Sequence, residues 1–217
     1  MKLFSKYKSL FLFLSILVVL LTSPFIGGDV RHLPNILLGI FWAVSIGIGG
    51  YIVSKSFQWM LVYAVMIGIV LLSVVFEFLI GANIGIQTLQ NIGVICIQTC
   101  AFYVVLKYSL SSNEEDATDR TLCGICGYFL IGLIWSRFFI LFQVFDPDAF
   151  NQTNLKEGDL VYFSLVNLTT LGYGDITPIN PFTRIVATLE SAFGTLYLAV
   201  MIATLVSELR SAKSTIQ

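Results

Sequence analysis

The chain has 217 residues, of which 57% are hydrophobic and only 12% are charged. A soluble domain carries about twice that charged fraction, so the composition argues against an ordinary soluble protein. The formal net charge is −1, which provides no basic surface and predicts no nucleic-acid partner. Apolar runs of about 20 residues recur along the chain and predict an integral membrane protein.

Six apolar segments predict an all-α membrane fold, because strands in lipid would need the alternating pattern of a closed barrel. Each segment is long enough to cross a hydrocarbon core of about 30 Å at about 1.5 Å per helical residue. In chain order the six predicted spans are Leu10–Gly27, Ile36–Val53, Phe57–Ile80, Gln87–Tyr108, Leu122–Phe145 and Phe182–Ser207.

The lysines and arginines orient these spans. An even number of spans places both termini on one side, which then holds eight basic residues against three on the other. Basic residues accumulate in the cytoplasm, so we expect a multi-pass protein of the cell membrane with both termini cytoplasmic. Alternatively, the first span is a signal peptide, with Lys2, Lys6 and Lys8 at its basic end, although no clear A-x-A cleavage pattern follows it.

Four cysteines lie in or next to predicted spans, and the sequence gives them no evident chemistry. Cys96 and Cys100 lie in the fourth span, and Cys123 and Cys126 form a C-G-I-C motif at the start of the fifth. A metal or redox site would need a loop and further ligands. We therefore interpret all four cysteines as small packing residues.

Three ionisable residues fall within predicted spans, where charges are costly and usually paired. Arg137 and Glu190 both lie about eight residues from an outer helix end, roughly 12 Å deep. Because the two residues lie at the same depth in the membrane, we hypothesise an Arg137–Glu190 ion pair, within or between subunits. The alternative is that Arg137 extends to the outer surface. Glu77 lies nearer the surface and is expected to be a solvated carboxylate.

The stretch between the fifth and sixth spans contains the apolar run Leu160–Leu168, which is too short to cross a membrane. Its length predicts a short re-entrant helix, with Asp159 capping its start. The motif TTLGYGD follows over Thr169–Asp175. Non-helical backbone at membrane depth is tolerated only where protein or water covers it, so this motif must line something polar.

Glycine at alternate positions explains what the motif can do. Gly172 and Gly174 can adopt left-handed conformations without steric cost, which turns successive carbonyls to one side. Four copies around an axis would form rings of oxygens that replace the water shell of an ion. Thr170 would add a ring of hydroxyls, and Tyr173 would brace the strand against the short helix. The negative C-terminal end of that helix favours a cation.

The Thr170–Asp175 run resembles the selectivity filter of potassium channels, and Tyr162–Thr169 resembles their pore helix. Gly194 follows Gly174 by twenty residues, where many members have a hinge glycine. The resemblance implies K⁺ as permeant ion, no organic cofactor, and a homotetramer in which each chain joins three identical subunits within membrane lipid. The implied K⁺-binding residues are Thr170, Leu171, Gly172 and Tyr173, with Gly174 completing the filter.

The resemblance also implies residues that support the filter and residues that gate it. Asp175 would lie behind the outer mouth and accept a hydrogen bond from Tyr162, and Thr169 would support the inner end. In the inner helix, Gly194 is interpreted as a hinge or a close-packing site, because glycine weakens a helix by about 1 kcal/mol. Four copies of Glu208 would concentrate cations at the inner mouth.

The resemblance divides the chain into two domains. Residues 1–118 form a four-helix sensor-like domain with an inner linker, and residues 119–217 form a pore domain of outer helix, pore helix, filter and inner helix. The fourth span carries no arginine or lysine before Lys107. Steep voltage gating needs several charges in the field, so we predict weak or no voltage sensing. A simple supporting helix is the alternative interpretation of this span.

Other classes of protein fit the sequence less well. An enzyme would need convergent acid, base or metal-binding residues. The predicted spans do not offer them, so we expect no enzymatic activity. A transporter with four unequal pore repeats would show further Gly-Tyr-Gly-Asp motifs, and the chain has one. The alternatives that remain are a regulatory, non-conducting channel subunit and a weakly selective cation channel.

Overall fold

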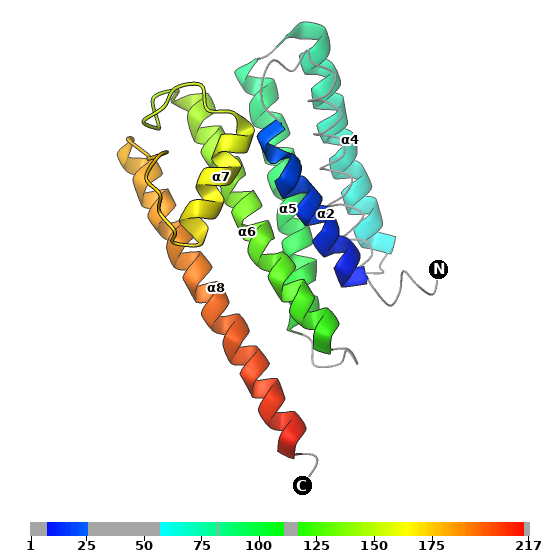
Figure 1. The fold of residues 1–217 in the computed structure, drawn as a ribbon. Coiled ribbons are helices and arrows are strands. Elements are labelled where there is room, and N and C mark those ends of the chain that lie inside the picture. The colour runs from blue at the N-terminus through cyan, green and yellow to red at the C-terminus, as the bar shows by residue number, and fades with distance from the viewer. Residues whose placement is uncertain (1–7, 26–56, 82, 111–116, 215–217) are drawn as a thin grey trace.

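The computed structural model describes residues 8–25, 57–81, 83–110 and 117–214, and these residues form a bundle of helices (Figure 1). Within these ranges no strand is present, and an isolated antiparallel bridge joins Phe150 to Pro178. The elements are α2 (Lys8–Thr22), η1 (Ser23–Phe25), α4 (Phe57–Ile80), α5 (Ile84–Ser109), α6 (Ala117–Phe145), α7 (Glu157–Leu168) and α8 (Pro181–Ser214).

Helices occupy five of the six predicted spans. The predicted span Ile36–Val53 lies outside the described residues. Three stretches are long and apolar enough to cross a membrane, namely Ile84–Ser109, Thr118–Phe145 and Pro181–Thr204. The described apolar parts of α2 and α4 are shorter. The all-α fold and its long apolar helices are consistent with a membrane channel.

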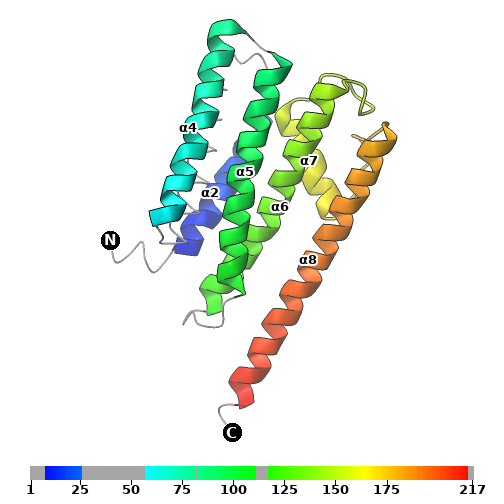
Figure 2. The ribbon, with the colours of Figure 1, turned by 180° about the vertical axis from the view of Figure 1, so that it is seen from behind.

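The long helices lie side by side, and the short helix α7 lies between α6 and α8 (Figures 1 and 2). Along the bundle, α4 packs against α5, α5 against α6, and α2 against α6. Helix α7 begins at the end of the bundle where α6 ends and α8 begins, and it stops partway along α8 (Figure 1). The predicted short helix is therefore present, with its C-terminus directed toward the middle of the bundle.

Two apolar cores hold these helices together. The larger core joins α2, α4, α5 and α6 and includes the buried Cys123 and Cys126, which confirms their role as packing residues. All four cysteines are free. The smaller core is aromatic and lies where α6, α7 and the following loop meet. There the ring of Phe139 lies 4.9 Å from that of Phe163 and 6.1 Å from that of Phe150, all edge to face.

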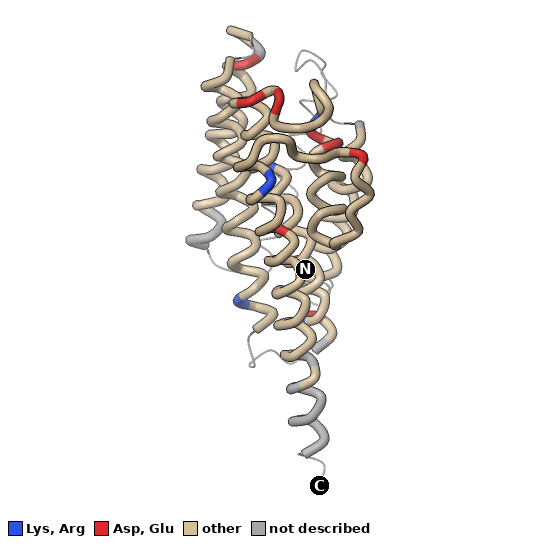
Figure 3. The backbone as a smooth tube through the Cα atoms, turned by 90° about the vertical axis from the view of Figure 1, so that its left-hand side faces the viewer, with Lys and Arg blue, Asp and Glu red and all other residues tan. Residues whose placement is uncertain are grey.

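Charged residues are sparse along the described helices (Figure 3). Glu77 was expected to be solvated, but only 4% of it is exposed. Helix α4 packs against α5, and this packing places Gln90 Nε2 2.6 Å from Glu77 Oε2, to which it donates a hydrogen bond. The expectation was wrong because depth along one helix says nothing about which neighbouring helix covers a side chain.

Candidate functional site

Helix α7 ends in a tight hydrogen-bonded turn. The backbone N–H of Thr170 donates to Asn167 O at 3.0 Å, and that of Leu171 donates to Val166 O at 2.9 Å. Thr170 has φ 58°, in the left-handed region. This pair of bonds with one left-handed residue is the Schellman arrangement, which satisfies the last carbonyls of a helix. The polar segment Thr169–Asp175, below called the 169–175 segment, therefore starts directly from the C-terminus of α7.

Left-handed residues alternate along the 169–175 segment. Gly172 has φ 61° and Gly174 has φ 77°, which confirms the conformation predicted for both glycines. Thr170 is a third left-handed position. The sequence did not predict it, because this conformation is strongly unfavourable for a β-branched residue. The backbone of this segment is thus neither helix nor ordinary strand.

The 169–175 segment is exposed along its whole length in a single chain. Every residue in it is exposed, with Leu171 56% and Tyr173 67% exposed. Most of the Tyr173 surface is thus uncovered within one chain, and its expected brace against α7 stays a prediction.

The outer end of the segment is tied down at Asp175. The Tyr162 hydroxyl donates a 2.8 Å hydrogen bond to Asp175 Oδ2, which is the contact expected from the sequence. This hydrogen bond lowers the pKa of Asp175 from its ordinary value of 3.8. Sequence reasoning missed two further donors, Asn151 Nδ2 and Gln152 Nε2, which lie 3.0 Å and 2.9 Å from the backbone oxygen of Asp175. The loop that holds Asn151 and Gln152 has no sequence pattern from which these contacts could have been predicted.

The inner end of the segment is tied to its own helix. The Thr169 hydroxyl donates to Leu165 O at 2.7 Å, so this side chain caps the end of α7. At the start of α7, Asp159 Oδ2 accepts the backbone N–H of Lys156 at 2.8 Å. Asp159 therefore helps to cap the helix as predicted, although it is the third helical residue and Lys156 is the N-cap.

Two predicted gating residues lie on α8, which continues as one helix from Pro181 to Ser214. Gly194 is buried, and a Cβ at this position would lie 2.5 Å from Leu168 O. The Tyr128 hydroxyl donates to the same oxygen at 3.1 Å. Gly194 thus allows α8 to approach the last turn of α7 closely. Glu208 lies on α8, but its side chain falls outside the described part of the chain.

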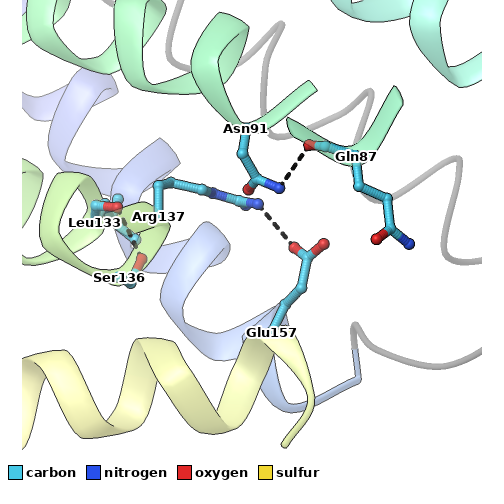
Figure 4. Close-up of polar contacts among 6 residues, drawn as sticks. All are labelled: Gln87, Asn91, Leu133, Ser136, Arg137 and Glu157. Atoms are coloured by element: carbon cyan, nitrogen blue, oxygen red, sulfur yellow. Dashed lines mark hydrogen bonds and ion pairs between the residues drawn. The ribbon is translucent and has the colours of Figure 1, made fainter. Parts of the chain in front are cut away.

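The structure corrects the predicted pairing of Arg137 with Glu190. Arg137 Nη1 lies 2.9 Å from Glu157 Oε2, in the first turn of α7, and Asn91 of α5 points toward the same arginine (Figure 4). The prediction compared depths on α6 and α8 only. Helix α7 lies between them and supplies a carboxylate closer to Arg137, at a helix N-terminus that favours negative charge.

Glu190 has other partners. Its Oε1 is hydrogen-bonded to the Ser164 hydroxyl, and its Oε2 accepts from Asn167 Nδ2 at 2.6 Å. Ser164 and Asn167 both belong to α7, the helix that leads into the 169–175 segment. The carboxyl group on α8 therefore fastens the C-terminal half of α7.

The sequence model of a family described as ion channel matches residues 124–211, which include α7 and the 169–175 segment. Two-pore potassium channel 5 of Arabidopsis thaliana is 39% identical over 49 residues, which make up 23% of this chain and 12% of the relative. The chain thus corresponds to only a small part of that relative. No solved structure matches the chain.

The two matches support a potassium-channel-type family, and the ion channels are a class of membrane proteins without enzymatic activity. The family match leaves residues 1–123 without a counterpart, because it begins at residue 124. The two matches therefore support an ion channel as the class of this site.

Proposed function

We propose that this protein is a potassium-selective channel that conducts K⁺ passively through a tetrameric pore. One observation carries this proposal, namely the left-handed backbone at Thr170, Gly172 and Gly174 directly after a short helix that stops within the bundle. Alternating left-handed residues let the carbonyls between Thr170 and Gly174 point to one side. Such carbonyl rows can replace the hydration shell of K⁺.

Four copies of the chain are needed because one row of carbonyls cannot surround an ion. The exposure of the whole 169–175 segment supports this assembly, since in a single chain the segment has no cover. Three identical subunits within membrane lipid would supply it. Tyr173 would then find its brace on a neighbouring copy.

The remaining parts of the proposal concern the first helices and the gate. Helices α2 and α4 run in the same direction (Figure 1), which supports a second span at Ile36–Val53, six spans in all and both termini in the cytoplasm. In this arrangement the first four spans form a sensor-like domain with weak or no voltage sensing. Gly194 and Glu208 on α8 would take part in gating.

The reversal potential of the purified protein in a planar bilayer, with K⁺ on one side and Na⁺ on the other, tests the proposal. We expect reversal close to the K⁺ equilibrium potential. The variant G172A should lose this selectivity, because its Cβ would strain a left-handed position. G68A on α4, where a Cβ would meet nothing within 4 Å, is the matched control.

The other outcomes point to the alternative functions. Reversal near zero would contradict potassium selectivity and favour a weakly selective cation channel. Silence at every voltage, with the tetramer intact, would favour a regulatory subunit that does not conduct by itself.

A further inference from the structure

A buried carboxyl group takes part in a hydrogen-bonded cluster of α6, α7 and α8 next to the 169–175 segment. Glu190 on α8 is 0% exposed, as is Ser164 on α7. Ser164 Oγ contacts Glu190 Oε1 and also lies 2.7 Å from Gly132 O on α6. Asn167 Nδ2 lies 2.6 Å from both Glu190 Oε2 and Ala187 O. Ser164 on α7 thus connects Gly132 on α6 with Glu190 on α8.

The hydrogen atoms in this cluster can be counted. Ser164 has one hydroxyl proton but contacts two oxygens that both act as acceptors when Glu190 is ionised. One of those contacts would then lack a proton. A neutral Glu190 removes the conflict, because its carboxylic acid donates to Ser164 Oγ and the Ser164 hydroxyl donates to Gly132 O. Asn167 has two N–H donors, one for Glu190 Oε2 and one for Ala187 O.

The charges of the surroundings favour the same state. The hydrogen-bond partners of Glu190 are Ser164 and Asn167, both neutral, and an ionised carboxylate buried among neutral groups is strongly disfavoured. The nearby titratable groups on α6, α7 and α8 bind elsewhere or are exposed. Tyr128 bonds Leu168 O, Tyr197 bonds Gly124 O, Arg137 pairs with Glu157, Tyr162 bonds Asp175, and Arg184 is exposed.

We propose that Glu190, as a neutral acid, is the positioning residue that holds the C-terminal half of α7 on α6 and α8 and thereby keeps the 169–175 segment in its selective shape. This inference rests on the proposed function. Ionisation turns the donor into an acceptor, so the contact of Ser164 with Gly132 or with Glu190 is lost. It also places a negative charge near the C-terminal half of α7, which the helix dipole opposes.

The test compares K⁺ over Na⁺ permeability in bilayers for the wild type, E190Q and E190A. Glutamine can donate to Ser164 and accept from Asn167, so E190Q should keep wild-type selectivity. E190A loses both contacts, and we expect its permeability ratio to fall by about tenfold, the effect of roughly one buried hydrogen bond. As pH is raised, the wild type should lose selectivity while E190Q should not, although both retain the tyrosines named above.

E77Q and E77A are the matched controls, because Glu77 is also buried and hydrogen-bonded but lies on α4. Both should keep wild-type selectivity and its pH dependence. The inference is overturned if E190Q loses selectivity as E190A does, or if the wild type and E190Q respond identically to pH. In either case a potassium-selective wild type would leave the proposed function standing.

A spectroscopic measurement decides the protonation state without any current. The infrared difference spectrum between the wild type and E190Q should contain the C=O stretch of a protonated carboxylic acid. Absence of this C=O stretch would overturn the inference, even if the pore proves to be non-selective. Its presence would support the inference, even if E190A fails to assemble.

Discussion

Thr170 occupies a backbone position that glycine usually fills. It is the left-handed residue after the last turn of α7, and its Cβ makes this conformation unfavourable by roughly 1–2 kcal/mol. Strain of this kind persists where the side chain is needed. The proposed need is the hydroxyl, which would face the ion path at the inner end of the 169–175 segment.

The variants T170G and T170S separate strain from function. T170G should raise the free energy of unfolding by up to about 1 kcal/mol, because glycine relieves the left-handed strain, yet its K⁺ conductance should fall. T170S keeps the hydroxyl and should conduct like the wild type. Thermal unfolding and bilayer recordings measure the two effects. Full conductance in T170G would show that the hydroxyl is not required.

The contact of Tyr162 with Asp175 predicts a dependence on acid. The hydrogen bond lowers the pKa of Asp175, so its stabilising effect is complete above the ordinary value of 3.8 and is lost as pH falls through the lowered value. Y162F removes the hydroxyl and lets the pKa rise. The acid loss of conductance should therefore begin at a higher pH in Y162F than in the wild type.

Recordings over a series of acid pH values measure this shift. Y103F, which alters an exposed tyrosine on α5, is the control and should behave like the wild type. Superimposable acid profiles for Y162F and the wild type would mean that the Tyr162–Asp175 contact does not hold the outer end of the segment.

At the scale of elements, the position of α7 depends on close contacts with its neighbours. Gly158 in its first turn lies against the backbone of Ser23, and Gly194 on α8 lies against its last residue, Leu168. The Arg137–Glu157 ion pair and the Glu190 contacts add polar attachments to α6 and α8. A short helix of 12 residues is marginal by itself, so these contacts hold it in place.

G194A tests the close approach of α7 and α8. Alanine improves helix propensity by about 1 kcal/mol, but its Cβ would lie 2.5 Å from the backbone oxygen of Leu168, which is not free to rotate away. Overpacking of this kind costs about 1–3 kcal/mol, so we expect G194A to be less stable than the wild type and less selective.

The control for G194A is G68A on α4, which gains propensity without a steric contact and should be as stable as the wild type or slightly more stable. Thermal unfolding of the detergent-solubilised protein gives the comparison. Equal stabilisation of both variants would show that Gly194 is a flexible position rather than a packing site.

At the scale of the whole molecule, α2, α4 and α5 share an apolar core with α6. Helix α5 contacts both α4 and α6, and its 26 residues include Lys107 as the only charged side chain. One charge near a helix end senses little of the membrane field, because each charge contributes about 2.3 kcal/mol per 100 mV only when it crosses the whole field.

The open probability should therefore be nearly independent of voltage, and single-channel recordings over a wide range of potentials measure this. The variant K107Q should not alter that result. A steep voltage dependence in the wild type that disappears in K107Q would show that this lysine is a gating charge and that the first helices sense voltage.

Several features followed from the sequence pattern alone. The positions of α4, α5, α6 and α8 agree closely with the predicted spans, because the length of an apolar run dictates a membrane helix regardless of its neighbours. The left-handed conformations of Gly172 and Gly174 were also predictable, because only glycine adopts them freely. The hydrogen bond of Tyr162 to Asp175 followed from resemblance to a known motif.

Other features depended on which helices pack together, and no local pattern encodes that. Arg137 pairs with Glu157 rather than Glu190 because α7 lies between α6 and α8. Glu77 is buried because α5 covers it, and Thr170 takes a left-handed conformation because α7 must end there. The length of an apolar run and the conformation of a glycine depend on each residue and its close neighbours in sequence. The partner of a buried charge and the point where a short helix ends are decided by three-dimensional contacts between distant segments.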